Sequence, residues 1–259
     1  MTLENRVALV TGAGRGIGRA IALRYAQAGA RVAIADLRVR EAEAVVQTIE
    51  SAGGSALAIE MDVTDEAAVD DGLARVAAAW GGLDIAVCNA GIQHLCRLES
   101  LALHDWKRVL SVHLDGAFLI TRAALPMLAA RGGGALIYMG SVHSKEASVQ
   151  KGPYVVAKHG LLGLCRTVAK EAGPQGVRAN VICPGFVRTE LLNQQLPELA
   201  RTHQMTEDAV LQELFLSSTV DGVLTTPEDI AETALFLAAH PSAALTGQSI
   251  VVSHGWHMQ

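Results

Sequence analysis

Short apolar runs alternate with amphipathic stretches along most of the chain. The runs are rich in valine, isoleucine and alanine and end in small or acidic residues, as buried strands do. They predict strands at 6–11, 31–36, 55–62, 83–91, 135–140, 177–185 and 248–253. Apolar positions at helical spacing predict helices at 16–29, 39–52, from Thr64 or Asp65 to Trp80, 104–130 and 153–172.

Strands that alternate with helices at this spacing build βαβ units around a buried parallel sheet. We therefore predict an α/β fold: a single Rossmann-like, doubly wound domain over residues 1–259, with a seven-stranded parallel sheet and helices on both faces. Residues 186–226 break the alternation and predict two short helices before a helix that opens at Pro227. This insertion follows the carboxyl end of a strand, which favours a substrate lid over a plain surface excursion.

The overall composition narrows the function classes. The 259 residues are 50% hydrophobic and carry a net charge of −5 with no basic stripe, which argues against a nucleic-acid partner. No apolar run approaches the length of a membrane span, and the N-terminus lacks the features of a signal peptide. The four cysteines are scattered and the nine histidines show no ligand spacing, so we expect a cytoplasmic protein without a metal.

A glycine-rich turn, TGAGRGIG at 11–18, joins the first strand to the first helix. Glycines in this context let the backbone approach a pyrophosphate, and the helix N-terminus offers N–H groups to it. The sequence therefore predicts dinucleotide binding by Gly12, Arg15, Gly16, Ile17 and Gly18.

Asp36 ends the second predicted strand, 18 residues after Gly18. A carboxylate there accepts hydrogen bonds from the adenosine ribose and repels a 2′-phosphate, which favours NAD over NADP as cofactor. Arg15 and Arg38 are a weaker, opposing signal, because either could neutralise a phosphate.

Two further strand ends are expected to border the cofactor. Asp62 and Val63 follow the third strand and are expected to bracket the adenine. Asn89, Ala90 and Gly91 follow the fourth strand, where small residues let a cofactor lie on the backbone. At both places the alternative is an ordinary turn.

Ser141, Tyr154 and Lys158 suggest proton chemistry. Tyr154 and Lys158 are four residues apart and so share one helix face. A phenol ordinarily has a pKa of about 10, and nearby ammonium groups, including that of Lys151, favour the phenolate. Tyr154 is then a candidate base for a substrate hydroxyl, and Ser141 a hydrogen-bond donor to the same oxygen. The alternative is a simple aromatic–lysine pair.

These motifs, with PG at 184–185, resemble those of the short-chain dehydrogenase/reductases in order and spacing over essentially the whole chain. The resemblance implies an NAD(P)(H)-dependent oxidoreductase that assembles as a homotetramer. It also implies that Ile182, Val187 and Thr189 flank the nicotinamide and that Lys158 holds its ribose. His113 departs from the pattern, because the family usually has an asparagine there that holds a relay water. A histidine either preserves that relay or displaces the water by its bulk.

Other segments, including GIQH at 91–94, SVH at 141–143 and HGW at 254–256, resemble the bacterial D-3-hydroxybutyrate dehydrogenases. That branch implies oxidation of (R)-3-hydroxybutyrate to acetoacetate, a small anionic hydroxy acid. The positions that match its substrate residues are Gln93, His143, Lys151, Gln195 and Trp256. Phe186 stands where a tryptophan is usual.

The residue types suit such a substrate, since Lys151 and His143 supply positive character, the glutamines donate hydrogen bonds and Trp256 forms a wall. Two alternatives remain open at this stage. The chain could oxidise another secondary alcohol, such as a sugar or a cyclic alcohol, or it could bind NAD without catalysis.

Overall fold

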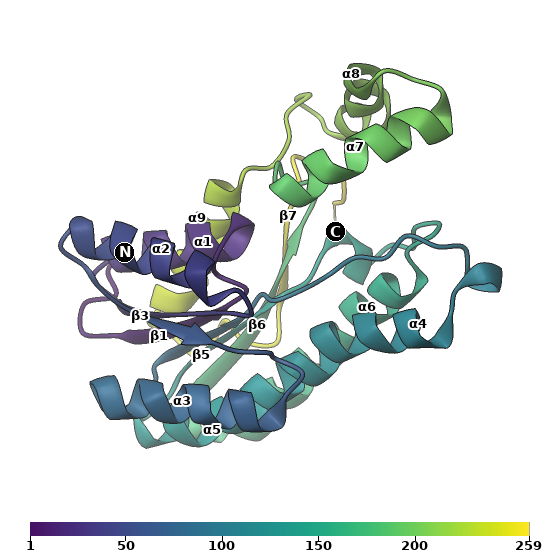
Figure 1. Ribbon diagram of the computed structural model, residues 1–259. Coiled ribbons are helices and arrows are strands. Elements are labelled where there is room, and N and C mark those ends of the chain that lie inside the picture. The colour runs from purple at the N-terminus through teal and green to yellow at the C-terminus, as the bar shows by residue number, and fades with distance from the viewer. Residues whose placement is uncertain (259) are drawn as a thin grey trace.

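A seven-stranded parallel sheet forms the centre of the computed structural model (Figure 1). The structure describes residues 1–258, without the side chains of Glu190, Leu191, Gln194 and Gln195. Its strands are β1 (Val7–Thr11), β2 (Arg31–Asp36), β3 (Ser55–Glu60), β4 (Ile85–Cys88), β5 (Gly134–Met139), β6 (Val177–Pro184) and β7 (Ser249–Val252). Their order is β3-β2-β1-β4-β5-β6-β7, so successive strands are added on one side of β1 as far as β3 and on its other side from β4 onward. This order confirms the predicted doubly wound fold.

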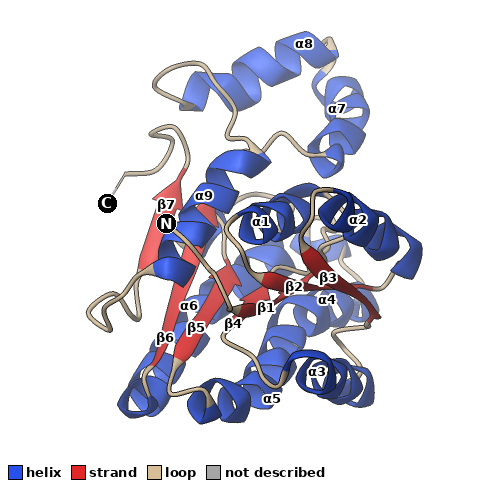
Figure 2. Cartoon of the chain, turned by 90° about the vertical axis from the view of Figure 1, so that its left-hand side faces the viewer, coloured by secondary structure: helices blue, strands red, loops and turns tan. Residues whose placement is uncertain are grey.

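Helices cover both faces of this sheet, α1, α2 and α9 on one side and α3, α4, α5 and α6 on the other (Figures 1 and 2). The bounds are α1 (Gly16–Gln27), α2 (Val39–Ser51), α3 (Glu66–Trp80), α4 (Leu103–Leu110), α5 (Gly116–Ala130), α6 (Gly152–Ala172) and α9 (Pro227–Ala239). Because both faces are covered, every residue of β1, β4 and β6 is buried, which explains why these strands read as continuous apolar runs.

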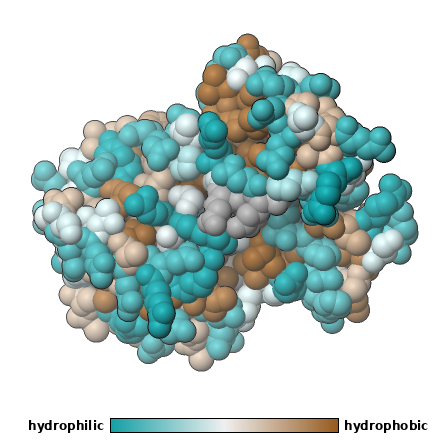
Figure 3. Space-filling view, turned by 45° about the horizontal axis from the view of Figure 1, so that its top comes forward, coloured by the Kyte–Doolittle hydropathy of each residue, from teal (hydrophilic) through white to brown (hydrophobic). Residues whose placement is uncertain are grey.

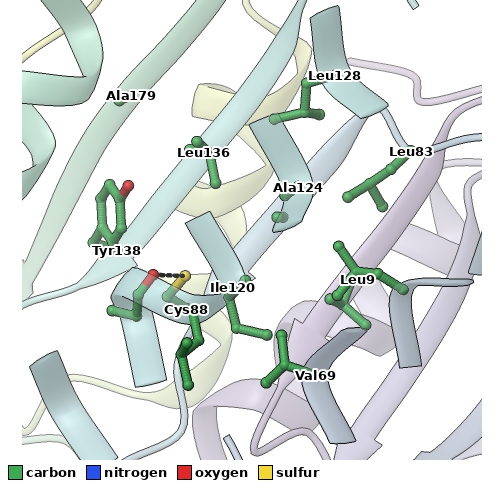
Figure 4. Close-up of a cluster of buried hydrophobic side chains, with 14 of the residues drawn as sticks. Leu9, Val69, Leu83, Cys88, Ile120, Ala124, Leu128, Leu136, Tyr138 and Ala179 are labelled. Carbon is green, nitrogen blue, oxygen red and sulfur yellow. Dashed lines mark hydrogen bonds between the residues drawn. The ribbon is translucent and has the colours of Figure 1, made fainter. Parts of the chain in front are cut away.

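Alternate residues of each strand enter different cores. Leu9 of β1 packs on the side of α3, α5 and α6 with Ile120 and Leu136, whereas Val10 packs on the side of α1, α2 and α9. Figure 4 shows the first of these cores, with Leu9, Ile120 and Leu136 pointing into it. This two-sided packing fixes the register of the strands and hence the position of their carboxyl ends.

The predicted helix at 104–130 is interrupted. A π-helical turn, Ser111–Asp115, separates α4 from α5 and contains His113. The whole stretch Leu103–Ala130 is long and apolar enough to cross a membrane by length and composition alone. Ile120, Ala124 and Leu128 are buried in the core, however, so here the apolar residues serve packing against the sheet.

The insertion at 186–226 folds as α7 (Glu190–His203) and α8 (Glu207–Val210), with a π-turn after α8. Two helices are therefore present, although α7 is longer than expected. The insertion encloses a small core of its own, formed by Leu192, Val210, Phe215 and Leu224. It stands away from the sheet in Figures 1 and 2, and apolar side chains gather on this lobe in Figure 3.

The base of the insertion is closed by backbone pairing. The Arg188 N–H donates to the Thr225 carbonyl at 2.9 Å, and the Thr225 N–H donates to the Phe186 carbonyl at 3.0 Å. The outgoing and returning segments therefore lie side by side at the carboxyl end of β6.

Candidate active site

The turn between β1 and α1 leaves room above its backbone. Gly12 and Gly16 have φ angles of +61° and +55°, in the left-handed region that favours glycine. A Cβ on Gly18 would lie 2.4 Å from the Gly12 carbonyl oxygen, so the turn folds tightly on itself. Beside Gly16, by contrast, the nearest atom to such a Cβ is Cγ2 of Thr189, at 3.8 Å. The backbone of the turn is therefore tightly packed at Gly18 and leaves open space beside Gly16.

The start of α1 suits an anion. Arg15 occupies the N-cap but makes no side-chain capping bond, and the first turn contains no acidic residue. α3, in contrast, is capped by Asp65, which accepts from the N–H groups of Ala67 and Ala68. The backbone N–H groups at the start of α1, including that of Ile17, can therefore bind a phosphate. The turn and this helix end together fit the pyrophosphate of a dinucleotide.

Asp36 lies beside the same turn, as the sequence predicts. Its carboxylate accepts hydrogen bonds from the Gly14 N–H at 2.9 Å and from the Arg38 N–H at 3.0 Å. The neighbouring strand end is held by Asp62, whose Oδ1 accepts from the Thr64 hydroxyl at 2.7 Å. Val63 packs closely against Gly116, since a Cβ added to Gly116 would lie 2.8 Å from Val63 Cγ2.

Asn89 ties the end of β4 to the glycine-rich turn. Its Nδ2 donates to the carbonyls of Thr11 and Gly12, at 2.9 and 3.1 Å. The Thr11 hydroxyl in turn accepts from the N–H groups of Asn89 and Ala90, at 3.0 and 3.1 Å. Thr11 is a positioning residue that our sequence reasoning missed, and its signal was a single hydroxyl at the end of an apolar strand.

Ser141, Tyr154 and Lys158 converge at the end of β5. Ser141 caps a short 3₁₀ turn, where its Oγ accepts from the His143 N–H at 3.1 Å. It also hydrogen-bonds the phenol of Tyr154. Lys158 lies one turn further along α6, with Nζ 5.3 Å from the centre of the Tyr154 ring, and donates to the Met139 carbonyl at 2.5 Å. A backbone acceptor such as Met139 has no signature in a sequence.

Burial is the largest influence on the ionisation of this cluster. Burial raises the pKa of Tyr154, while the hydrogen bond from Ser141 lowers it. Burial also lowers the pKa of Lys158 to about 7. In the chain by itself, loss of hydration is the larger effect on Tyr154. The lowering of the phenol pKa by the lysines together with a bound nicotinamide stays a prediction.

His113 links the loop after β4 to the π-helical turn between α4 and α5. Its Nε2 lies 2.7 Å from the carbonyl oxygen of Ile92, and the ring meets that of Tyr154 edge-on at 5.4 Å. Gly91 is needed here, since a Cβ would lie 2.4 Å from His113 Cε1. Burial and the charge of Lys158 lower the pKa of His113 to about 3, so the ring is neutral.

A cavity of about 10 Å³ remains between His113 and Lys158. This volume is at the lower limit for one water molecule, so the histidine leaves that space open. Its part in a proton relay stays a prediction.

Three of the expected substrate residues, Lys151, His143 and Trp256, form a continuous set of contacts that reaches Tyr154. Lys151 Nζ lies 3.3 Å from His143 Nε2, and the His143 ring meets the rings of Tyr154 and Trp256 edge-on. Phe186 stacks on Trp256 with ring centres 4.0 Å apart. Together they form an aromatic wall that leads from the phenol to the base of the insertion.

Of the two residues expected to bring positive charge to this pocket, Lys151 and His143, the histidine is neutral. Burial and the neighbouring Lys151 lower the pKa of His143 to about 4, so our expectation of positive character at His143 is wrong. The His143 Nδ1 is buried and has no hydrogen-bond partner among the residues that the structure describes.

The remaining predicted residues have these places. Gln93 lies half-buried in the loop after β4. Gln195 lies in α7, and its side chain is outside the described part of the structure. Val187 pairs with Thr225 at the base of the insertion, whereas Ile182 is fully buried in β6. Over residues 1–258, apart from the four omitted side chains, no three His, Cys, Asp or Glu side chains gather as metal ligands.

Comparison with known proteins agrees with this geometry. A family model described as enoyl-(acyl carrier protein) reductase matches residues 12–257. The D-beta-hydroxybutyrate dehydrogenase of Rhizobium meliloti is 38% identical, over 98% of this chain and 99% of its own. The D-threitol dehydrogenase of Mycolicibacterium smegmatis is 35% identical, over 98% of this chain and 94% of its own. A crystal structure of a short-chain type dehydrogenase/reductase from Mycobacterium marinum superposes with a TM-score of 0.90 at 32% identity, covering 100% of this chain and 98% of that one. The chain therefore belongs to the short-chain dehydrogenase/reductases, a family of oxidoreductases that use NAD(H) or NADP(H).

Proposed function

We propose that the protein oxidises (R)-3-hydroxybutyrate to acetoacetate, reversibly, with NAD as the cofactor. The observation that carries the proposal is the position of Lys151, whose ammonium group lies 3.3 Å from His143 in the pocket that also holds Tyr154. A cation at this distance from the reacting group suits a substrate with a carboxylate two carbons from its hydroxyl. The 38% identity to a D-beta-hydroxybutyrate dehydrogenase supports the same substrate.

The pocket divides its tasks between polar and aromatic groups. Lys151 binds the substrate carboxylate, and His143 offers a neutral ring nitrogen beside it. The stacked rings of Phe186 and Trp256 provide an apolar surface for the methyl end of the substrate. The insertion is a lid over this pocket, because its base carries Phe186.

The proton is handled by the chain's own residues. Tyr154, as phenolate, takes the proton of the substrate hydroxyl, while Ser141 donates a hydrogen bond to the same oxygen. Lys158 binds the nicotinamide ribose. NAD⁺, when bound, supplies the acceptor for the hydride that leaves the carbinol carbon, and its positive ring favours the phenolate. The substrate is thus oxidised to the ketone, with its proton on Tyr154.

The predicted contacts around the cofactor follow from the same arrangement. Asp36 accepts hydrogen bonds from the adenosine ribose, which favours NAD over NADP. Thr189 lies over Gly16 and caps α7, so it joins the lid to the cofactor site.

The assembly proposed here is a cytoplasmic homotetramer. Phe118 of α5 and Val156 of α6 are 49% and 45% exposed, which suits a face covered by a second copy. Light scattering on the purified protein is expected to give four times the chain mass, and a monomer would overturn this part of the proposal.

The function is tested by following NADH formation with D- and L-3-hydroxybutyrate and a panel of uncharged alcohols that includes D-threitol. We expect turnover of the D enantiomer and its loss in Tyr154→Phe. Turnover of an uncharged alcohol, with neither enantiomer of 3-hydroxybutyrate accepted, would overturn the proposed substrate. D-threitol is the most informative alcohol of the panel, given the 35% identity to a D-threitol dehydrogenase. Nucleotide binding without any turnover would favour a non-catalytic protein.

Lys151→Ala separates recognition of the carboxylate from the chemistry. Loss of one charge-assisted contact is expected to raise KM for 3-hydroxybutyrate at least about tenfold with a smaller change in kcat. Lys170→Ala, at an exposed position near the end of α6, is the matched control and is expected to change neither KM nor kcat. An unchanged KM in Lys151→Ala would contradict the assignment of the cation.

A further inference from the structure

A second carboxylate lies beside Asp36. Glu41, in the first turn of α2, packs against the glycine-rich turn so closely that a Cβ on Gly14 would meet Glu41 Cβ at 2.7 Å. The same Cβ would lie 3.0 Å from Asp36 Oδ2. Gly14 is thus enclosed by two acids, one at the end of β2 and the other on α2.

Arg38 is held between these acids. Its Nη1 lies 3.0 Å from Glu41 Oε1, and its Nε lies 3.8 Å from Asp36 Oδ1. The other carboxylate oxygen, Glu41 Oε2, is shielded from solvent and has no hydrogen-bond partner among the residues that the structure describes. Glu41 therefore places a second carboxyl group next to Asp36 and also occupies the guanidinium of Arg38.

An open cavity of about 410 Å³ adjoins this group. Gly14, Arg15, Arg19, Arg38 and Glu41 contribute to its lining. Three arginines around a cavity would ordinarily suit a phosphate. Here Arg38 is engaged by both carboxylates, and Glu41 itself is part of the cavity lining. The balance between binding and repelling a phosphate therefore depends on Glu41.

We infer that Glu41 is a cofactor-selecting residue that disfavours a 2′-phosphorylated dinucleotide. It acts by repelling the phosphate and by holding Arg38 away from it, and it adds to the effect of Asp36. This inference rests on the cofactor site of the proposed function and is independent of the substrate.

Nucleotide binding tests it without any turnover. NADH and NADPH are titrated into the full chain, and binding is followed by the change in nucleotide fluorescence. The parent protein is expected to bind NADH more tightly than NADPH. Glu41→Gln, which keeps the size of the side chain, is expected to tighten NADPH binding about tenfold, the effect of roughly one close charge pair in a partly screened site. NADH binding is expected to stay within about threefold.

Two further variants isolate the cause. Glu43→Gln removes the same charge from an exposed position on the same helix and is expected to change neither affinity. Adding Arg38→Ala to Glu41→Gln is expected to cancel most of the gain for NADPH, because the released guanidinium is then absent.

An unchanged NADPH affinity in Glu41→Gln, an equal change for both nucleotides, or a parent that already binds both equally would overturn the inference. A parent that binds neither nucleotide would overturn it together with the proposed cofactor. A parent that binds NADH more tightly than NADPH but does not oxidise 3-hydroxybutyrate would overturn only the proposed substrate.

Discussion

His113 and His143 are residues whose chemistry is set by burial. Both line the site, and burial is the first cause of their lowered pKa values, about 3 and about 4 against the usual 6.5. Both rings are therefore neutral at physiological pH and act as fixed hydrogen-bonding groups. A sequence identifies a histidine but does not give its burial, which is why we expected positive character at His143.

These two pKa values predict acid sensitivity of the fold. Because the folded-state values lie below the unfolded ones, the stability gained by keeping the rings neutral is fully present above pH 6.5 and is lost as the pH falls toward 4 and 3. Each ring adds about 1.4 kcal/mol per pH unit to the slope within its window. Chemical denaturation at several pH values measures that slope.

Each of the variants His113→Asn and His143→Asn is expected to make the slope shallower by about one proton between pH 6.5 and 4. His104→Asn, at a side chain 80% exposed, is the control and is expected to leave it unchanged. A slope that is the same in all four proteins would show that the buried rings do not carry the acid sensitivity.

The ionisation of the Tyr154 phenol predicts how activity depends on pH. Burial raises the pKa of its phenol and the hydrogen bond from Ser141 lowers it, so oxidation is expected to accelerate as the pH rises above neutral. Ser141→Ala is expected to move that rise to higher pH and to lower kcat, because one stabilising contact to the phenolate is lost. Ser148→Ala, in the following loop, is expected to leave the profile of kcat against pH in place. A Ser141→Ala profile at the parental position would assign Ser141 to the substrate alone.

At the level of helices and strands, capping and hydrophobic period explain what could be predicted. Asp65, one of the two expected caps, caps α3, and all seven strands appear within a few residues of their predicted ranges. The π-turn at Ser111–Asp115 was not predicted, and neither was the contact that His113 makes from it to Ile92 on another segment. The sequence likewise predicted that Ser141, Tyr154 and Lys158 lie together but not the backbone carbonyl that holds Lys158.

The cap of α9 gives a test of stability at this level. Thr226 Oγ1 accepts from the Asp229 N–H at 3.2 Å, and Asp229 Oδ2 accepts from the Thr226 N–H at 2.8 Å. Thr226→Ala removes the side-chain acceptor and is expected to lower the free energy of unfolding by about 1 kcal/mol. Thr233→Ala, later in the same helix, keeps the cap and is expected to change stability by less than about half as much. Equal losses in the two variants would contradict the capping argument.

Across the whole molecule, the insertion is set apart from the sheet by its packing. Its apolar side chains form a separate small core, and backbone hydrogen bonds near Phe186, Arg188 and Thr225 close its base. One more backbone bond, from the Val220 N–H to the His254 carbonyl at 2.9 Å, joins it to the C-terminal segment. A unit with few contacts to the body can open without unfolding the sheet.

Hydrogen exchange should show this difference in stability. Amides of residues 207–218 are expected to exchange at least about tenfold faster than those of β1 and β5, because they open locally while the sheet opens only on global unfolding. Addition of NAD⁺ with acetoacetate, a pair that cannot exchange a hydride, is expected to slow exchange in 207–218 and to leave β5 unchanged. Equal protection of both regions without ligand would mean that the insertion is not an independently opening unit.

The stacked pair of Phe186 and Trp256 has a practical consequence. The indole of Trp256 lies flat on the Phe186 ring at the base of the insertion and edge-on to His143 in the pocket, so it borders both the insertion and the candidate active site. The other two tryptophans, Trp80 and Trp106, lie in α3 and α4 and can be replaced by phenylalanine. The intrinsic fluorescence of the remaining indole would then report the binding and release of a small acid without an attached dye.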